Sequence, residues 1–256
     1  MAFGICNLSI VPLRSEASDA SEMVTQLLFG EVFEVLETQK KWSFIKLAYD
    51  DYEAWIDNKQ FTALDEATFK KLKLSKSKLT GELSQFVVAD NEALTVLPLG
   101  ASLPFFKNNK LQISTKEYTY EGNIYDANTI KENIINTAFL YLNAPYLWGG
   151  KTPFGIDCSG FTQMVYKLNG FKLPRDASQQ AKRGHVLSFI EESEAGDLAF
   201  FDNQEGNITH VGIIMKNNYI IHASGKVRMD RLDQFGIYNE EIQKHTHKLR
   251  IIKKVV

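Results

Sequence analysis

Alternating apolar and polar residues dominate the first quarter of the chain. The alternation covers Leu8–Leu13, Val32–Leu36 and Trp42–Leu47, and it is broken at Gly30 and at Asp50–Asp51. Short alternating runs at close spacing, without helical periodicity, are typical of the strands of a small β-barrel. We therefore expect a barrel domain over residues 1–64.

A stretch rich in Lys, Glu and Leu follows at residues 65–78 and predicts a short helix or connector. The strand pattern returns over residues 79–125, with turn signals at Gly81, Pro98–Gly100 and Asn108–Asn109. This weaker pattern predicts a second, diverged barrel.

Helical patterns begin near Asp126. Thr129 and Glu132 form a capping box, after which apolar residues recur at four-residue spacing until Pro145 ends the helix; they are Ile130, Ile134, Ala138 and Leu142. Asp157 is placed to cap a second helix that buries one apolar face and is closed by Gly170. Asp176, with Gln179, repeats the capping pattern for a short third helix that ends near Gly184.

The rest of the chain predicts strands at Leu198–Phe201, Ile208–Met215, Tyr219–Ser224 and Leu249–Val256. Helices followed by a run of antiparallel strands indicate an α+β domain over residues 126–256.

Charge and composition exclude several classes of protein. Lys and Arg number 29 against 31 Asp and Glu, which gives a net charge of −2 and no electrostatic case for a nucleic-acid partner or an anionic membrane. No run approaches the roughly 18 apolar residues that span a bilayer. The start lacks the positive residues and unbroken apolar run of a secretory signal, so we expect a cytoplasmic protein.

Cys158 is the first candidate for chemistry. The other cysteine, Cys6, is 152 positions away, so neither a disulfide framework nor a Cys-rich zinc site is indicated. Cys158 follows the capping Asp157 at the first turn of a predicted helix, where free N–H groups and the helix dipole favour a thiolate. Such a position can lower the pKa of a thiol to roughly 3.5–7.5, and the alternative is an inert buried cysteine.

Two histidines interrupt apolar strands after this cysteine. His210 and His222 flank the turn at Lys216–Asn218. One imidazole could accept the thiol proton while the second fixes its tautomer, provided that both rings lie on one face. A two-residue loop would put them on opposite faces, whereas a three-residue loop pairs Met215 with Tyr219 and puts both on the same face. The catalytic hypothesis therefore predicts an odd loop; the alternative is two core histidines.

The remaining histidines, His185, His245 and His247, are interpreted as surface or loop residues. His245 and His247 could bind a stray metal ion, but no matching carboxylate or cysteine pattern supports a metal site.

Five segments, in order and spacing, resemble the NlpC-type cell-wall cysteine peptidases. They are Pro145–Gly150, Gly155–Phe161, Leu173–Asp176, His210–Ile213 and His222–Ser224. The resemblance implies a papain-like catalytic domain, with helices packed on an antiparallel sheet. The first half is similar to the bacterial SH3-like barrels, one or two of which precede such domains, on the weaker evidence of Leu28–Glu31, Trp42 and Tyr52–Trp55.

The resemblance assigns roles to individual residues. It implies that Cys158 is the nucleophile, His210 the general base and His222 the orienting residue. Tyr146 would donate to the oxyanion together with the backbone N–H of Cys158, and a core aromatic is the alternative for Tyr146. No metal or organic cofactor is implied.

The branch that the chain resembles most is the recycling-type γ-D-glutamyl-L-diamino acid endopeptidases. By that resemblance Trp148, Asp157, Ser159 and Asp176 line the substrate site, although Asp157 and Asp176 could equally be helix caps. Tyr52 and Glu22 of the barrel would contact the free amine of an N-terminal L-Ala, the alternative being solvated surface. Ala177 stands where that branch has a hydroxyl residue.

The resemblance therefore implies hydrolysis of the bond between γ-D-Glu and meso-diaminopimelate or Lys in murein tri- or tetrapeptides, as a step of cell-wall recycling. Two alternatives are an amidase or acyltransferase that uses the same thiol, and a wall-binding module with a vestigial peptidase domain.

Overall fold

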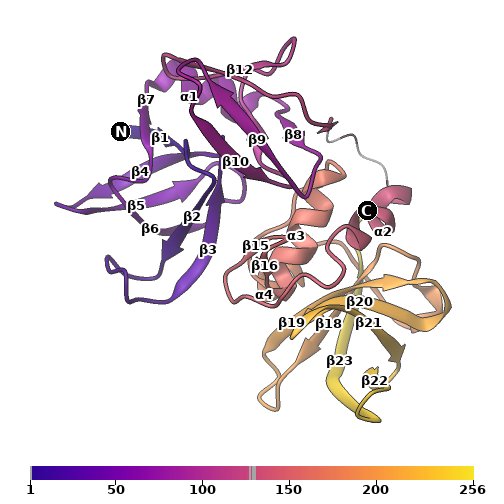
Figure 1. Ribbon diagram of the computed structural model, residues 1–256. Coiled ribbons are helices and arrows are strands. Elements are labelled where there is room, and N and C mark those ends of the chain that lie inside the picture. Colours follow the sequence, from indigo (N-terminus) through magenta and orange to yellow (C-terminus); the bar gives the residue numbers. More distant parts are fainter. Residues whose placement is uncertain (1, 127, 129–130) are drawn as a thin grey trace. The chain divides into compact units, whose positions relative to one another are not determined.

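The computed structural model describes residues 2–126, 128 and 131–256, which divide into two compact units (Figure 1). The first unit extends to Asn128 and the second begins at Thr129. None of the helices in the described ranges is long and apolar enough to cross a membrane.

The first unit is built almost entirely of short antiparallel strands. A seven-stranded sheet has the order β3-β2-β6-β5-β4-β1-β7, and two smaller sheets have the orders β10-β9-β13-β12 and β11-β8-β14. The strands are β1 Ala2–Ile5, β2 Ile10–Arg14, β3 Met23–Leu28, β4 Val32–Thr38, β5 Trp42–Leu47, β6 Glu53–Asp57, β7 Thr62–Leu64, β8 Lys78–Thr80, β9 Ser84–Ala89, β10 Leu94–Pro98, β11 Ser102–Leu103, β12 Lys110–Ile113, β13 Lys116–Thr119 and β14 Ile124–Tyr125.

The predicted strands of the first barrel form, and side chains that alternate along them fill its core. Val11 and Leu13 on β2 meet Ile45 and Leu47 on β5, all of them buried. The alternation missed β1, β3, β6 and β7, which are too short or too mixed in polarity to stand out.

The stretch at residues 65–78 contains a helix, α1 Glu66–Leu74, which begins where the carboxylate of Asp65 accepts a hydrogen bond from the amide of Thr68. The two parts of the first unit are joined by a hydrogen bond from the amide of Ser102 to the carbonyl of Phe29. The finer division into two barrels at residues 64 and 79 stays a prediction.

The second unit consists of a few helices and a closed barrel. Six strands pair in the order β23-β18-β19-β20-β21-β22, and β22 pairs back with β23 to close the ring. The strands of this unit are β15 Lys151–Thr152, β16 Gly155–Ile156, β17 His185–Leu187, β18 Leu198–Asp202, β19 Ile208–Met215, β20 Tyr219–Ser224, β21 Lys226–Asp233, β22 Gly236–Asn239 and β23 Lys244–Lys254. Its helices are α2 Ile134–Phe139, α3 Cys158–Leu168 and α4 Ala177–Gln180, with 3₁₀ turns at Lys131–Asn133, Ile190–Glu192 and Lys216–Asn218.

The first predicted helix is shorter than expected. Of its capping box, Thr129 lies outside the described residues, as does Ile130 of its apolar face. Helix α2 ends at Phe139 rather than at Pro145, because the next amides bond three residues back in 3₁₀ fashion and Asn143 then turns left-handed at φ 67°.

Helix α3 forms at the predicted place, and all of its residues, rather than one apolar face alone, are buried. Asp157 caps its first turn, the amide of Gly160 donating to Oδ1 at 2.7 Å. Gly170 follows its end with φ 77°. A side chain at Gly160 could not fit, since a Cβ there would lie 2.3 Å from the carbonyl oxygen of Gly150. The helix packs against β19 and β20, and this contact brings Cys158 to the strands that carry His210 and His222.

Candidate active site

The imidazoles of His210 and His222 lie on the same face of the barrel wall. Met215 pairs with Tyr219 and Gly212 with His222, so the β19–β20 loop has three residues, Lys216–Asn218. Asn217 and Asn218 adopt left-handed conformations, with φ 60° and 59°, which asparagine tolerates better than most residues. The predicted odd loop is confirmed.

A hydrogen-bonded chain joins three buried side chains on this face. Nε2 of His210 lies 2.8 Å from Nδ1 of His222, and Nε2 of His222 lies 2.9 Å from Oδ2 of Asp230 on β21. Asp230 was not singled out from the sequence, because strand β21 itself was not predicted.

His247 is not the surface residue that the sequence predicted. Its ring is partly buried and stacks on that of His210, with centroids 4.1 Å apart and an interplanar angle of 26°. The error arose because Lys244–Lys248 has a polar sequence, whereas closure of the barrel places His247 opposite Ile237 of β22. His185 and His245 are exposed, as expected.

His210, His222 and His247 form a cluster whose ligating nitrogens lie within 4.8 Å of one another. Such a set can bind a transition metal when the ring lone pairs converge on one point about 2 Å from each nitrogen. The rings of His210 and His247 are nearly parallel, so their in-plane lone pairs do not converge. The arrangement fits two stacked neutral imidazoles better than a metal centre.

Cys158 occupies the first position of α3 and is buried, with 6% of its surface exposed. Its Sγ lies 4.0 Å from the carbonyl oxygen of Thr209, the residue before His210. Among the described residues no hydrogen bond joins this sulfur to an imidazole, so the thiol is next to the histidine strand without being engaged by a base.

The helix N-terminus does not lower the pKa of this thiol, contrary to the expectation from sequence. Burial raises the pKa of Cys158 to about 12, and the nearby Asp157 carboxylate adds to the effect. Contacts with backbone amides and Arg175 act in the opposite direction but are weaker. The desolvation of a buried sulfur therefore outweighs the partial positive charge of the helix end.

The two histidines are also held in their neutral forms. Burial lowers the pKa of His210 well below 6.5, and the neighbouring rings of His222 and His247 lower it further. Burial lowers the pKa of His222 as well, despite its hydrogen bond to Asp230. At pH 7 the substrate-free site thus contains a thiol and imidazoles, not a preformed thiolate–imidazolium pair.

Asp157 does more than cap α3. Arg175, itself buried, binds its two oxygens at 3.0 and 2.5 Å and also donates to Ser159 Oγ at 2.9 Å. The amide of Gly149 donates to Oδ2 at 2.8 Å, which fixes the segment before α3. The capping interpretation of Asp157 is confirmed, and contact of Asp157 or Ser159 with substrate stays a prediction. Arg175 was missed as a site residue, although it stands in the Leu173–Asp176 motif.

Tyr146 and Trp148 lie on the segment that leads into the Gly149–Gly150 turn. Tyr146 pairs with Ile156, two residues before Cys158. Burial raises the pKa of Tyr146 to about 12, and the charge of Cys158 adds to the shift. Trp148 is 59% exposed. The turn requires glycine, because a Cβ on Gly150 would lie 2.3 Å from the carbonyl oxygen of Gly155.

The other predicted substrate residues are more dispersed. Asp176 precedes α4, but its side chain makes no capping hydrogen bond there, so the expected capping box is not formed. Tyr52 packs against the core of the first unit, and Glu22 is exposed just before β3. The role of Tyr52 and Glu22 in amine binding stays a prediction.

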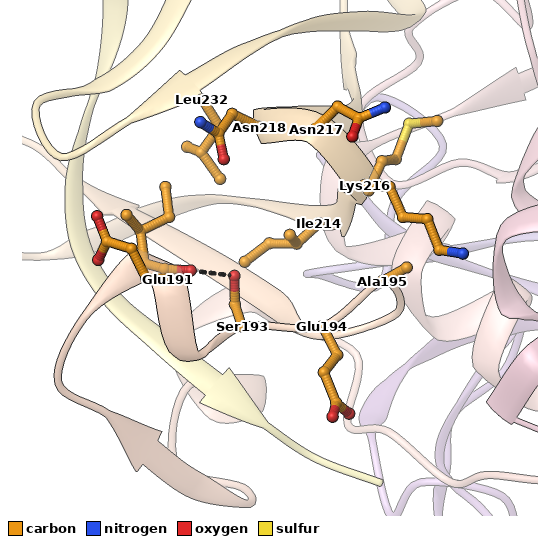
Figure 2. A pocket seen from close by; sticks show the side chains of 11 residues that line it. Glu191, Ser193, Glu194, Ala195, Ile214, Lys216, Asn217, Asn218 and Leu232 are labelled. Atoms are coloured by element: carbon orange, nitrogen blue, oxygen red, sulfur yellow. Dashed lines mark hydrogen bonds between the residues drawn. The ribbon is translucent and has the colours of Figure 1, made fainter.

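A pocket of about 380 Å³ lies elsewhere on the second unit. Figure 2 shows Ile214 between Ser193 on one side and Leu232 and Asn218 on the other. His210 is near the start of β19 and Ile214 near its end, so the pocket and the histidines occupy opposite ends of one strand. None of the candidate catalytic residues lines it.

Segments in both halves of the chain are similar to known protein families. The NlpC/P60 family matches residues 143–250, and the bacterial dipeptidyl-peptidase Sh3 domain matches residues 13–61. The gamma-D-glutamyl-L-lysine dipeptidyl-peptidase of Bacillus subtilis is 32% identical over 78% of this chain and 71% of its own length. Dipeptidyl-peptidase 6 of Lysinibacillus sphaericus is 27% identical over 90% of this chain and 92% of its own.

Two solved structures share the fold over almost the whole chain. An NlpC/P60 family protein from Bacillus cereus superposes with a TM-score of 0.81 at 19% identity and covers 99% of both chains. An NlpC/P60 endopeptidase from Photobacterium damselae superposes with a TM-score of 0.73 at 18% identity, over 97% of this chain and 70% of that one.

Proposed function

Since the chain belongs to the NlpC/P60 family, we propose that it is a cysteine peptidase that cleaves the γ-D-glutamyl–L-diamino acid bond of cell-wall peptides. The observation that carries this proposal is the hydrogen-bonded pair His210–His222 on the strands against which α3 packs, with Cys158 at the start of that helix.

The names of the relatives support the substrate class. Two are gamma-D-glutamyl-L-lysine dipeptidyl-peptidases, and a third is a dipeptidyl-peptidase. A dipeptidyl-peptidase removes two residues from a free N-terminus, which here would be L-Ala-γ-D-Glu. We infer that the diamino acid is L-Lys or meso-diaminopimelate and that the substrate is a murein tri- or tetrapeptide.

The neutral site defines how the reaction begins. His210 Nε2 is occupied by His222, which leaves Nδ1 to accept the thiol proton. The thiol turns from the Thr209 carbonyl, Sγ bonds to the γ-carbonyl carbon of D-Glu, and its proton moves to His210. Proton transfer accompanies attack because neither group is ionised beforehand.

The remaining steps return the proton and release both products. The imidazolium gives its proton to the amine of the diamino acid as the C–N bond breaks, leaving a thioester on Cys158. A water molecule activated by His210 then hydrolyses the thioester and frees the dipeptide. The hydroxyl of Tyr146 and the backbone N–H of Cys158 would stabilise the oxyanion, each such donor being worth about 2.7–4 kcal/mol.

We further propose that the catalytic domain is papain-like, with α3 supplying the nucleophile and the strands beside it the base. Trp148, Ser159 and Asp176 would line the substrate site, with Asp157 holding its backbone in place. Tyr52 and Glu22 would bind the free amine of L-Ala through an acceptor oxygen and a carboxylate.

Replacement of the nucleophile tests the activity. Cys158→Ala should abolish release of the diamino acid from L-Ala-γ-D-Glu-L-Lys and from the meso-diaminopimelate peptide, measured by mass spectrometry, because no other group can form the thioester. Cys6→Ala, at the other buried cysteine, is the matched control and should keep activity. Full activity of Cys158→Ala would refute the assignment.

Blocking one amine tests recognition of the N-terminus. Acetylating the L-Ala amine should lower kcat/KM at least about tenfold, since a charged hydrogen bond contributes roughly 1.5–3 kcal/mol. The same peptide acetylated on the lysine side chain controls for bulk. Equal rates for the free and the N-acetylated peptide would contradict amine recognition.

The biological setting is a separate proposal. An enzyme that needs a free L-Ala amine acts on peptides already released from the glycan strands, which fits recycling in the cytoplasm. Fractionation of cells that express the chain would test the location, and recovery outside the cytoplasm would contradict it.

A further inference from the structure

The hydrogen-bonded series that begins at His210 continues beyond His222. His222 passes a hydrogen bond on to Asp230, whose carboxylate is only 4% exposed. The roles given to Cys158, His210 and His222 account for the first links of this chain but give no reason for a buried carboxylate at its end.

Asp230 is held in place and held ionised. Arg228 donates from Nε to Oδ2 at 2.7 Å and from Nη2 to Oδ1 at 3.0 Å, and it is itself bound by Glu241 at 3.1 Å. Burial alone would raise the pKa of Asp230, but the hydrogen bonds from His222 and Arg228 bring it below its usual range. The carboxylate can therefore only accept hydrogen bonds.

An acceptor at this position determines the tautomers of both rings. If Asp230 accepts, Nε2 of His222 must carry the hydrogen, and Nδ1 of the neutral ring becomes an acceptor. That nitrogen faces Nε2 of His210 at 2.8 Å, which must then be the donor. The only unprotonated nitrogen left on His210 is Nδ1, the one that the proposed reaction uses as a base.

We propose that Asp230 is a positioning residue that selects, through His222, the His210 tautomer with a free Nδ1. The site is then a relay of four groups, Cys158, His210, His222 and Asp230, in which Arg228 orients the last. This inference rests on the proposed function for its consequence in catalysis, but the tautomers themselves can be measured without any substrate.

The first experiment is NMR of the full chain with ¹⁵N-labelled histidine near pH 7.5. We expect His210 and His222 both to be protonated at Nε2. Asp230→Leu removes the acceptor, so His222 should shift to the Nδ1–H form and force His210 into the Nδ1–H form as well. Unchanged tautomers in this variant, or an Nδ1–H form of His222 in the natural sequence, would overturn the proposal.

The chain offers a matched control for the loss of an aspartate next to a histidine. Asp233 lies on the same strand and bonds to His245 Nε2 at 2.9 Å, but this pair is about 40% exposed. Asp233 is three residues from Asp230, an odd spacing that places the two side chains on opposite faces of β21. Asp233→Leu should leave the tautomers of His210 and His222 and the turnover rate unchanged.

Turnover supplies the second measurement. Outer partners that orient metal-bound histidines typically contribute about 10–100-fold to activity. By the same reasoning we expect Asp230→Leu to lower kcat by a factor of that order, with little change in KM. In a His222→Ala background the same substitution should cost less than about twofold, because Asp230 acts only through that ring. Equal losses in both backgrounds would indicate a merely structural role and contradict the relay.

A second variant covers the case in which Asp230→Leu does not fold. Asp230→Asn has the same shape and retains one acceptor oxygen, so we expect a mixture of His222 tautomers and a smaller loss of kcat than in Asp230→Leu. A loss of kcat with both tautomers unchanged would contradict the proposal. Failure of the proposed function is distinguishable, because an active Cys158→Ala variant would refute the assignment of Cys158 as the nucleophile while leaving the NMR result intact.

Discussion

The thiol of Cys158 is protonated and unreactive in the substrate-free site. It is buried, its pKa is raised to about 12, and its neighbour His210 is neutral. A peptidase of this kind resembles serine enzymes in needing base and nucleophile to act together, since the proton must leave sulfur as the new bond forms. Such a resting state also protects the sulfur from oxidation, which follows thiolate character and exposure.

This leads to a prediction for alkylation. In a Cys6→Ala background, iodoacetamide should modify Cys158 at pH 7.5 at least about tenfold more slowly than it modifies glutathione, because the reactive thiolate is scarce and poorly accessible. The rate, followed by mass spectrometry, should go on rising with pH to the highest pH at which the fold survives. A rate that levels off below about pH 7 would contradict the neutral thiol.

At this scale the sequence identified the residues whose chemistry is visible in a short motif. Cys158 follows a capping residue, and His210 and His222 interrupt apolar strands. Asp230 and His247 could not be found in that way, because each depends on which strands become neighbours. A polar residue in a polar segment gives no signal until barrel closure buries it.

A turn and an ion pair position the strands and the helix that carry the candidate catalytic residues. The three-residue turn at Lys216–Asn218 sets the register of β19 and β20, and therefore the face on which His222 lies. The Asp157–Arg175 pair ties the first turn of α3 to the segment before α4. The length of the β19–β20 turn was predicted from side-chain alternation. For Asp157 the helix cap was predicted, but the ion pair with Arg175 was not.

The buried ion pair gives a stability prediction. Asp157→Asn keeps an oxygen that can cap α3 but leaves the Arg175 guanidinium buried without a counterion. Breaking such a pair costs about 3–5 kcal/mol, so the free energy of unfolding of the second unit should fall by that order in urea titration.

The helix cap of the first unit is the matched control. Asp65→Asn changes an exposed cap that has no buried partner, and it should cost well under about 1 kcal/mol. Similar losses for both variants would show that capping alone, rather than the ion pair, is what Asp157 contributes.

Strand prediction succeeded where one face is buried and apolar. The bounds of β19 and β20 match the predicted ranges, because Ile, Val and Tyr fill them. Strand β21 was missed because Arg228 and Asp230 occupy positions that in most strands hold apolar side chains. The free-energy cost of burying these two charges is offset by their hydrogen bonds to each other and to His222.

The stability of the folded molecule depends on pH through the cluster of His210, His222 and His247. Burial lowers the pKa of His210, His222 and His247, the last to about 4. The unfolded chain, with histidines near 6.5, binds more protons than the folded one below that pH. The stability of the fold is therefore complete above about pH 6.5 and is lost as the pH falls towards 4.

The expected size can be stated for one ring. Each pKa unit corresponds to about 1.4 kcal/mol, and His247 is partly exposed, so it should account for on the order of 2 kcal/mol between about pH 7 and pH 4.5. His247→Gln should reduce the fall in unfolding free energy by that amount in calorimetry or urea titration. His185→Gln, at an exposed ring on β17, is the control, and an equal effect of both variants would contradict the assignment.

Closure of the barrel has a consequence for biosynthesis. Strand β18 takes one partner, β19, from the residues that follow it at once, and the other, β23, from residues 244–254. During translation the β23 side of β18 therefore stays unpaired for about the few seconds that synthesis of residues 203–254 takes. Over that time its backbone amides and its apolar side chains, Leu-Ala-Phe-Phe, are exposed and can pair with strands of other chains. Nascent chains of this protein should accordingly bind cotranslational chaperones until β23 has been synthesised and has left the ribosome.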